Sequence, residues 1–141
     1  MFFCCEELDF CLGAIARGWG VRYRGDLAVR HKLSPERRLS WQGKRWFHFV
    51  RNRIYVERKH GAGWAALAPR MAGYLVKGIC NGLTGDTLRA IAAALRLSAG
   101  LTVRPKPERA RAYIASNDRA HRRSALLRIK DEVLIRLPRA A

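Results

Sequence analysis

Residues 2–10 read Phe2-Phe3-Cys4-Cys5-Glu6-Glu7-Leu8-Asp9-Phe10, so three carboxylates open an otherwise apolar stretch. Large side chains then recur at helical spacing, at Leu8, Cys11, Leu12, Ile15 and Trp19. This period predicts an amphipathic helix with one buried face, and Gly18 is a stop signal for it. Val21, Tyr23, Leu27, Val29 and His31 alternate as half-buried strands do. We therefore expect carboxylates at a helix start and one imidazole returned close to them.

The acidic cluster is open to two interpretations. Acidic side chains favour helix N-termini, because the free N–H groups and the helix macrodipole attract negative charge. Glu6, Glu7 and Asp9 would then stabilise the helix and do nothing else, and His31 would be a partly buried surface histidine. Alternatively, a carboxylate in reach of a hydroxyl group is what general base catalysis requires. The pattern alone favours the structural interpretation.

The order of these residues resembles the late catalytic segment of the family 2 inverting glycosyltransferases, which have the GT-A fold. The resemblance covers Phe-Phe-x-x-Glu-Glu-x-Asp-Phe, a helix, Gly-Trp, an aromatic strand residue and Ala28-Val29-Arg30-His31. It implies that Glu7, the second acid after Glu6, is the general base that deprotonates the acceptor hydroxyl, and that Asp9 orients the acceptor. It further implies that His31 helps to hold a divalent cation, Mg²⁺ or Mn²⁺, under a nucleotide-sugar donor, where the metal stabilises the leaving diphosphate.

A second group of motif residues lies in a basic segment that we expect to be helical from Leu39 onward. Gln42-Gly43-Lys44-Arg45-Trp46 fits the Gln-x-x-Arg-Trp motif of processive polysaccharide synthases, and Arg51-Asn52-Arg53 resembles the Arg-Asn pair of non-processive rhamnosyl- and related transferases. The resemblance implies donor or acceptor contacts for Gln42, Arg45, Trp46, Arg51, Asn52 and Arg53, with the tryptophan stacked on the acceptor sugar.

The alternative for this segment is an amphipathic basic helix whose aromatic side chains belong to the core and whose arginines are solvated. Processive synthases continue into transmembrane helices, whereas no apolar run in this chain approaches the ~20 residues needed to span a bilayer. The sequence therefore favours a non-processive transferase.

The charge of the chain is strongly one-sided. Its 141 residues include 28 Lys+Arg and 11 Asp+Glu, a formal net charge of +17, although residues 1–16 carry three acids and no base. A basic surface suits a nucleotide diphosphate, an anionic lipid surface or a nucleic acid. The rival function is therefore a small basic nucleic-acid-binding protein, whose stacking platforms would be Trp41, Trp46, Phe47, Phe49 and Tyr55. A peripheral membrane-binding helical protein is a third reading.

The four cysteines form no C-x-x-C pair and no Cys/His metal spacing. We expect buried, reduced thiols, which are typical of a cytoplasmic protein.

The overall expectation is an α/β fragment, mostly α-helical, that forms the C-terminal piece of a GT-A glycosyltransferase domain: a helix, short strands and several amphipathic helices. Residues 1–60 would complete the catalytic domain, 61–103 form a helical C-terminal extension that opens with the Gly61-Ala62-Gly63 break, and 104–141 form a basic tail. Either Asp86 or Thr87 is expected to cap a helix within the extension.

The nucleotide-binding half and its Asp-x-Asp motif have no counterpart in this chain. We therefore predict the back portion of a longer enzyme that is inactive without that half. It would transfer a sugar from a nucleotide-sugar to a glycan or lipid-linked acceptor, in the cytoplasm or peripherally on the inner face of the plasma membrane.

Overall fold

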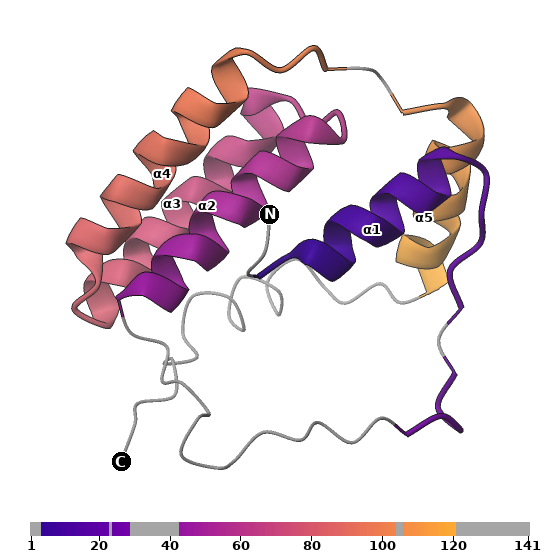
Figure 1. Ribbon diagram of the computed structural model, residues 1–141, viewed down its shortest axis with the longest axis horizontal. Helices are drawn as coiled ribbons and strands as arrows, with labels where there is room; N and C mark the ends of the chain where they lie inside the picture. The colour runs from indigo at the N-terminus through magenta and orange to yellow at the C-terminus, as the bar shows by residue number, and fades with distance from the viewer. Residues whose placement is uncertain (1–3, 23, 29–42, 104–105, 121–141) are drawn as a thin grey trace.

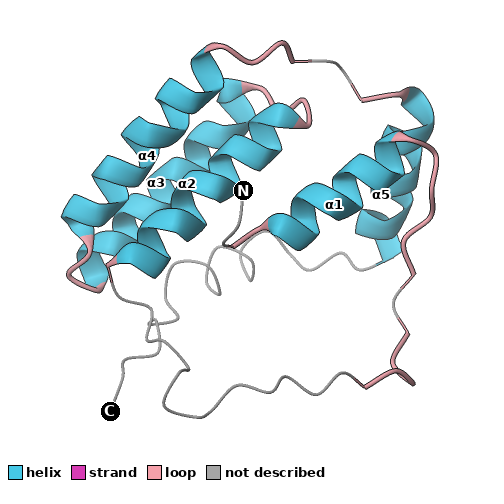
Figure 2. Ribbon diagram, viewed as in Figure 1, coloured by secondary structure: helices cyan, strands magenta, loops and turns pink. Residues whose placement is uncertain are grey.

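A computed structural model describes residues 4–22, 24–28, 43–103 and 106–120, which form five α-helices and no strand (Figure 2). The helices are α1 (Glu6–Ala16), α2 (Lys44–Lys59), α3 (Trp64–Cys80), α4 (Thr84–Ala99) and α5 (Glu108–Ala120). Figure 1 shows α2, α3 and α4 side by side as a three-helix bundle, with α1 beside α5. The expectation of a mostly helical chain is confirmed. No helix in the described ranges combines the length and apolarity needed to cross a membrane.

The core of the bundle follows from the spacing of its apolar residues. Trp46, Val50 and Ile54 recur every four residues on α2, and none is more than 1% exposed. Helix α4 meets them with the small side chains of Ala90 and Ala94, both fully buried. Small residues on α4 leave room for the large ones on α2, and each fully buried large apolar side chain contributes about 1.5–3 kcal/mol. Packing of these two faces is therefore the main source of stability in the bundle.

The three helices of the bundle meet at one polar contact inside this core. The indole Nε1 of Trp46 donates a hydrogen bond of 2.8 Å to Oγ1 of Thr87, which in turn donates to the carbonyl oxygen of Leu83 at 2.8 Å. Gly78 of α3 lies against the same hydroxyl, so closely that a Cβ atom there would collide with it. A glycine, a hydroxyl and an indole N–H thus fix how the three helices approach one another.

Glycines end two of the helices where the sequence predicts an end. Gly18 (φ +88°) follows α1, and Gly61 (φ +90°) follows α2. In both places the next residue donates its N–H to a carbonyl five residues back, from Trp19 to Ala14 and from Ala62 to Glu57. This is the Schellman arrangement, in which a left-handed glycine lets the chain satisfy the last helical carbonyls.

The predicted strands are not present in the described residues. Residues 21, 22 and 24–28 are loop, whereas residues 23 and 29–31 lie outside the described ranges. A strand requires a neighbouring strand for its backbone groups, and here the backbone of Val21 pairs with a side chain instead. The hydroxyl of Tyr113 on α5 accepts from the Val21 N–H at 3.0 Å and donates to the Val21 carbonyl at 2.6 Å.

Three smaller expectations also need correction. Helix α4 begins at Thr84 after Leu83, so Asp86 and Thr87 lie inside its first turn and neither caps it. Helix α2 begins at Lys44 because Gly43 before it is not helical, so a helix does not run unbroken from Leu39, and residues 39–42 lie outside the described ranges. The thiols are not buried: three are half-buried and Cys80 is exposed, although all four cysteines are free as expected.

We predict that Gly78→Ala lowers the free energy of unfolding by about 2 kcal/mol, because overpacking a filled core typically costs 1–3 kcal/mol. Urea unfolding followed by circular dichroism measures this change.

Gly85→Ala is the matched control, since Gly85 lies in the first turn of α4 and has no heavy atom within 4 Å of the place that an added Cβ would take. We expect that control to raise stability by roughly 0.5 kcal/mol, as a helical alanine does. Equal effects of the two substitutions would contradict the close contact between Gly78 and Thr87.

Candidate functional site

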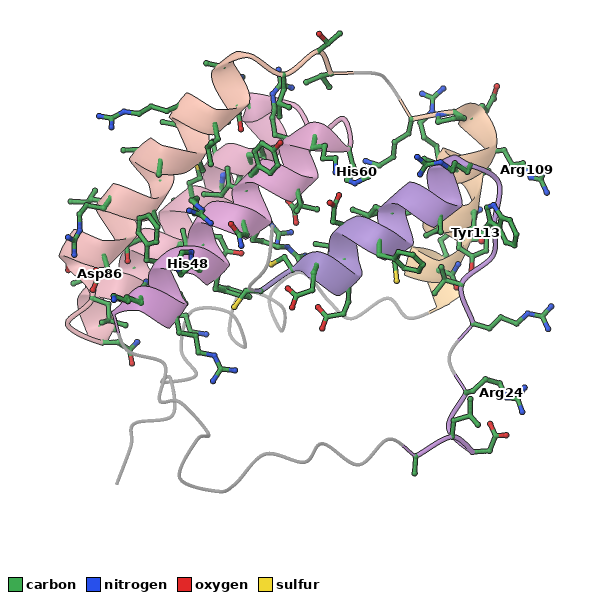
Figure 3. The ribbon with its side chains drawn as sticks, viewed as in Figure 1. Arg24, His48, His60, Asp86, Arg109 and Tyr113 are labelled. Carbon is green, nitrogen blue, oxygen red and sulfur yellow. The ribbon has the colours of Figure 1, made fainter. Side chains whose placement is uncertain are left out.

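An acidic side chain ties α1 to the end of α2. The Asp9 carboxylate accepts two hydrogen bonds from Nζ of Lys59, at 2.9 and 2.8 Å, and its Oδ1 lies 2.7 Å from Nε2 of His60. Figure 3 shows His60 at the end of the bundle, between α2 and α1. The side chain of His60 is only 11% exposed and that of Asp9 is 23% exposed. We refer to Asp9, Lys59 and His60 as the Asp9 cluster.

Two opposing effects set the protonation state of Asp9. Burial raises the pKa of its carboxyl, but the hydrogen bonds and charges of Lys59 and His60 outweigh burial and hold the pKa below its ordinary value of 3.8. The positions also suit the helix dipoles, since Asp9 lies in the first turn of α1 and Lys59 in the last turn of α2. Asp9 is therefore a carboxylate at neutral pH and is held by the ammonium group of Lys59 and the imidazole of His60.

A second contact fixes the chain just before α1. The buried amide of Asn52 on α2 donates from Nδ2 to the carbonyl oxygen of Cys4 at 3.1 Å. Burial raises the pKa of the neighbouring Cys5 thiol to about 11, although the nearby charge of Arg53 lowers it in part. Cys5 is therefore a protonated, structural thiol at neutral pH. The start of α1 thus rests on the face of α2 that carries residues 52 and 53.

An open groove of about 1220 Å³ runs along α1, past the Asp9 cluster, to the segment before α5. Its ionisable lining residues are Glu6, Asp9, Arg17, Lys59, His60 and Lys106. Phe10 and Trp19, which are 77% and 71% exposed, contribute aromatic surface. The groove therefore combines more cationic than acidic groups with exposed rings, a combination suited to an anionic ligand that also has an apolar or flat part.

The predicted catalytic acids differ in their surroundings. Glu6 and Glu7 are exposed on the first turn of α1, and Glu6 lines the groove. Within the described ranges neither makes a side-chain hydrogen bond or ion pair, unlike Asp9. His31 and Gln42 lie outside the described residues.

The predicted binding residues on α2 differ in their surroundings: Trp46 lies in the core, and the arginines make contacts with neighbouring side chains. Trp46 is 1% exposed, and its indole N–H already bonds Thr87. Arg51 donates to Oδ1 of Asn52 at 2.9 Å, and Arg53 donates to Oε1 of Glu57 at 2.7 Å. Burial raises the pKa of the Cys4 thiol, and the adjacent charge of Arg45 partly offsets this. The structure thus brings residues 45, 52 and 53 close to the segment that leads into the acidic pair.

Two residues of the site were not predicted from the sequence. Lys59 and His60 are the partners of Asp9, fifty and fifty-one residues further along the chain. A weak signal was available, since a basic pair at the end of a basic helix directly precedes the Gly61 stop.

The described residues give no support to a metal centre. No group of three or more His, Cys, Asp or Glu side chains that could hold a metal ion occurs among them. Asp9 is occupied by Lys59 and His60, so its surroundings do not fit a metal ligand. Cation binding through His31 stays a prediction.

Comparison with protein-family models, with curated proteins and with solved structures yields no match to this chain.

We predict that Asp9→Asn loosens α1 from the bundle. Hydrogen–deuterium exchange at neutral pH should become faster over residues 6–16 and remain unchanged over α3 and α4. Unfolding in urea should show a loss of about 1 kcal/mol, the scale of a partly exposed charged hydrogen bond.

The pH dependence gives a further check of the same variant. A carboxyl group whose pKa is lowered by folding stabilises the folded state at pH values above 3.8. This stabilisation is lost as the pH falls through the pKa of the folded state. The difference in the free energy of unfolding between the wild type and Asp9→Asn should therefore vanish in strong acid. Asp26→Asn is the control, because its pair with Arg24 is exposed and only two residues apart. Faster exchange of α1 in that control would contradict a specific role for Asp9.

Proposed function

We propose that this chain is the C-terminal portion of a non-processive inverting glycosyltransferase of the GT-A type. Glu7 is its general base, the donor is a nucleotide-sugar and the acceptor is a glycan or lipid-linked sugar, with the reaction in the cytoplasm. The resemblance of the first thirty-one residues is the source of this proposal. The geometry of α1 supports it, because the acidic pair is exposed and has no partner among the described residues.

The contrast with four paired acids is the observation that carries the proposal. Asp9, Asp26, Glu57 and Asp86 each form an ion pair in the described structure. Glu7 forms none there, yet its helix is fixed by the Asp9 cluster and by the bond from Asn52 to Cys4. An exposed carboxylate on a positioned helix is what a general base requires, because it must reach an incoming hydroxyl.

In the proposed reaction the acceptor hydroxyl gives its proton to the Glu7 carboxylate as its oxygen attacks the anomeric carbon. The bond from that carbon to the diphosphate oxygen breaks on the opposite face, so the configuration inverts and a nucleoside diphosphate leaves. Arg17 and Lys106 in the groove supply positive charge for an anionic group of the donor or acceptor. No step is assigned to a metal ion, for which the described residues offer no ligand group.

Two features of the core bear on the rival interpretations. Trp46 is buried and its ring lies 5.9 Å from the rings of both Phe49 and Tyr74. It therefore offers no free face to a sugar, and the proposal gives it no stacking role. The same contacts occupy two of the aromatic side chains that a nucleic-acid-binding function would need as stacking platforms.

The test begins with the coding sequence directly upstream of Met1, read in frame and expressed together with this chain. We expect the joined product to release a nucleoside diphosphate from a nucleotide-sugar in the presence of Mn²⁺ and an acceptor. Glu7→Gln should lower that rate by about 10²–10⁴-fold, the usual contribution of a general base.

Glu108→Gln is the matched control, since Glu108 is likewise an exposed acid in the first turn of a helix. We expect the rate of this variant to equal that of the wild type. An upstream sequence that encodes no α/β domain, or a Glu7→Gln variant with full activity, would refute the proposal.

A further inference from the structure

Helix α3 is apolar on two opposite faces. Its inner face carries Leu67, Met71, Tyr74 and Gly78, which pack in the bundle. Its outer face carries a second row at alternating spacings of four and three, and all its members are exposed: Ala65, Pro69, Ala72, Val76 and Ile79. The last two are 42% and 62% exposed. A helix that is hydrophobic on opposite faces is normally covered on both, so the exposed outer face of α3 is a candidate docking surface.

Few charges interrupt this surface, and those nearby are positive. Helix α3 contains only Arg70 and Lys77 as charged residues, and Arg70 lies on the inner side in an ion pair with Glu57. Between residues 61 and 103 the chain has four bases and a single acid, Asp86, whose charge is paired with Arg89. Helix α3 itself therefore carries positive charge and no acid, within a chain of formal charge +17.

Charge complementarity indicates which partner fits the outer face of α3. A second copy of the chain would bring the same positive charge to the contact, and the two copies would repel each other. An anionic bilayer offers both an apolar layer for the exposed row and negative charge for the bases around it. Helix α3 has 17 residues and does not qualify as a membrane-spanning helix, so it would lie along the surface.

We infer that the outer face of α3 docks the protein onto an anionic lipid surface, with Val76 and Ile79 inserted into the apolar layer. The inference goes beyond the proposed glycosyl transfer and does not depend on it, because it rests on the exposed apolar row and the charge around it. The proposed reaction and the docking surface can each fail without the other.

The test is sedimentation of the full chain with vesicles of equal parts phosphatidylcholine and phosphatidylglycerol, at physiological ionic strength. We expect binding to these vesicles and much weaker binding to pure phosphatidylcholine. Ile79→Glu should weaken binding about tenfold, because the gain from burying one large apolar side chain is lost. Circular dichroism of the variant should match the wild type, since Ile79 is exposed.

Leu27→Glu is the matched control, with the same change of charge at a side chain that is 68% exposed and lies in the loop after α1. It should bind as the wild type does. Equal weakening by the two substitutions would mean that net charge alone governs adsorption, and would overturn the inference.

Cys80 supplies an independent readout, because this free thiol is exposed at the end of α3. Vesicles should protect it from a membrane-impermeant maleimide, as peptide mass spectrometry can measure. Unchanged modification of Cys80 on bound protein would place another surface on the lipid. Sedimentation velocity without lipid tests whether a second copy of the chain covers the outer face of α3 instead. A wild-type dimer that Ile79→Glu converts to a monomer would show that it does, and would overturn the inference.

Discussion

The hydrogen bond from the Trp46 indole to the Thr87 hydroxyl is the constraint on which the bundle depends. A buried indole N–H without a partner would cost about 1–3 kcal/mol, so α2 and α4 must meet in the register that brings these two groups together. The same hydroxyl excludes any side chain at Gly78, and α3 is thereby held at the distance that only a glycine permits. One polar contact inside an apolar core thus determines the relative position of three helices, whereas the apolar side chains around it supply most of the stability.

The attachment of α1 is of a different physical kind. None of its residues is fully buried, and it is joined to α2 by the Asp9 cluster and by the bond from Asn52 to Cys4. Interactions of this type depend on charge and hydrogen bonding more than on burial. The position of the helix that carries the acidic pair is thus defined by a few specific contacts that are individually weak. Phe10 on this helix and Trp19 just after it remain exposed. The proposed catalytic role of Glu7 requires a defined position, because a base must lie where the hydroxyl arrives.

Local patterns predicted the positions of the helices better than their burial. The face of α1 that was expected to be buried has no fully buried residue, and Trp19 is 71% exposed. The recurrence of apolar residues and the glycines at 18 and 61 located α1 and the end of α2, because these signals depend on near neighbours in the chain. The prediction of strands over residues 21–31 was wrong for the residues that the structure describes. Alternation of apolar and polar residues cannot reveal whether a partner strand exists. Thr87, one of the two residues expected to cap α4, instead accepts a bond from a residue forty-one positions away. Lys59 and His60 were missed for the same reason: their role depends on which acid the fold brings to them. The exposed acidic pair at the start of α1 was placed by the sequence alone.

The bonds between Val21 and the Tyr113 hydroxyl join segments ninety-two residues apart. By contrast, α2, α3 and α4 are consecutive, and short turns connect them. Loop closure carries an entropic cost that grows with the length of chain enclosed, and local contacts form faster than distant ones. The bundle should therefore assemble early, around its own turns, and α1 and α5 should meet last. The chain would then have a rapidly formed, low-contact-order nucleus, and the acidic pair would belong to the part that closes slowest and opens first.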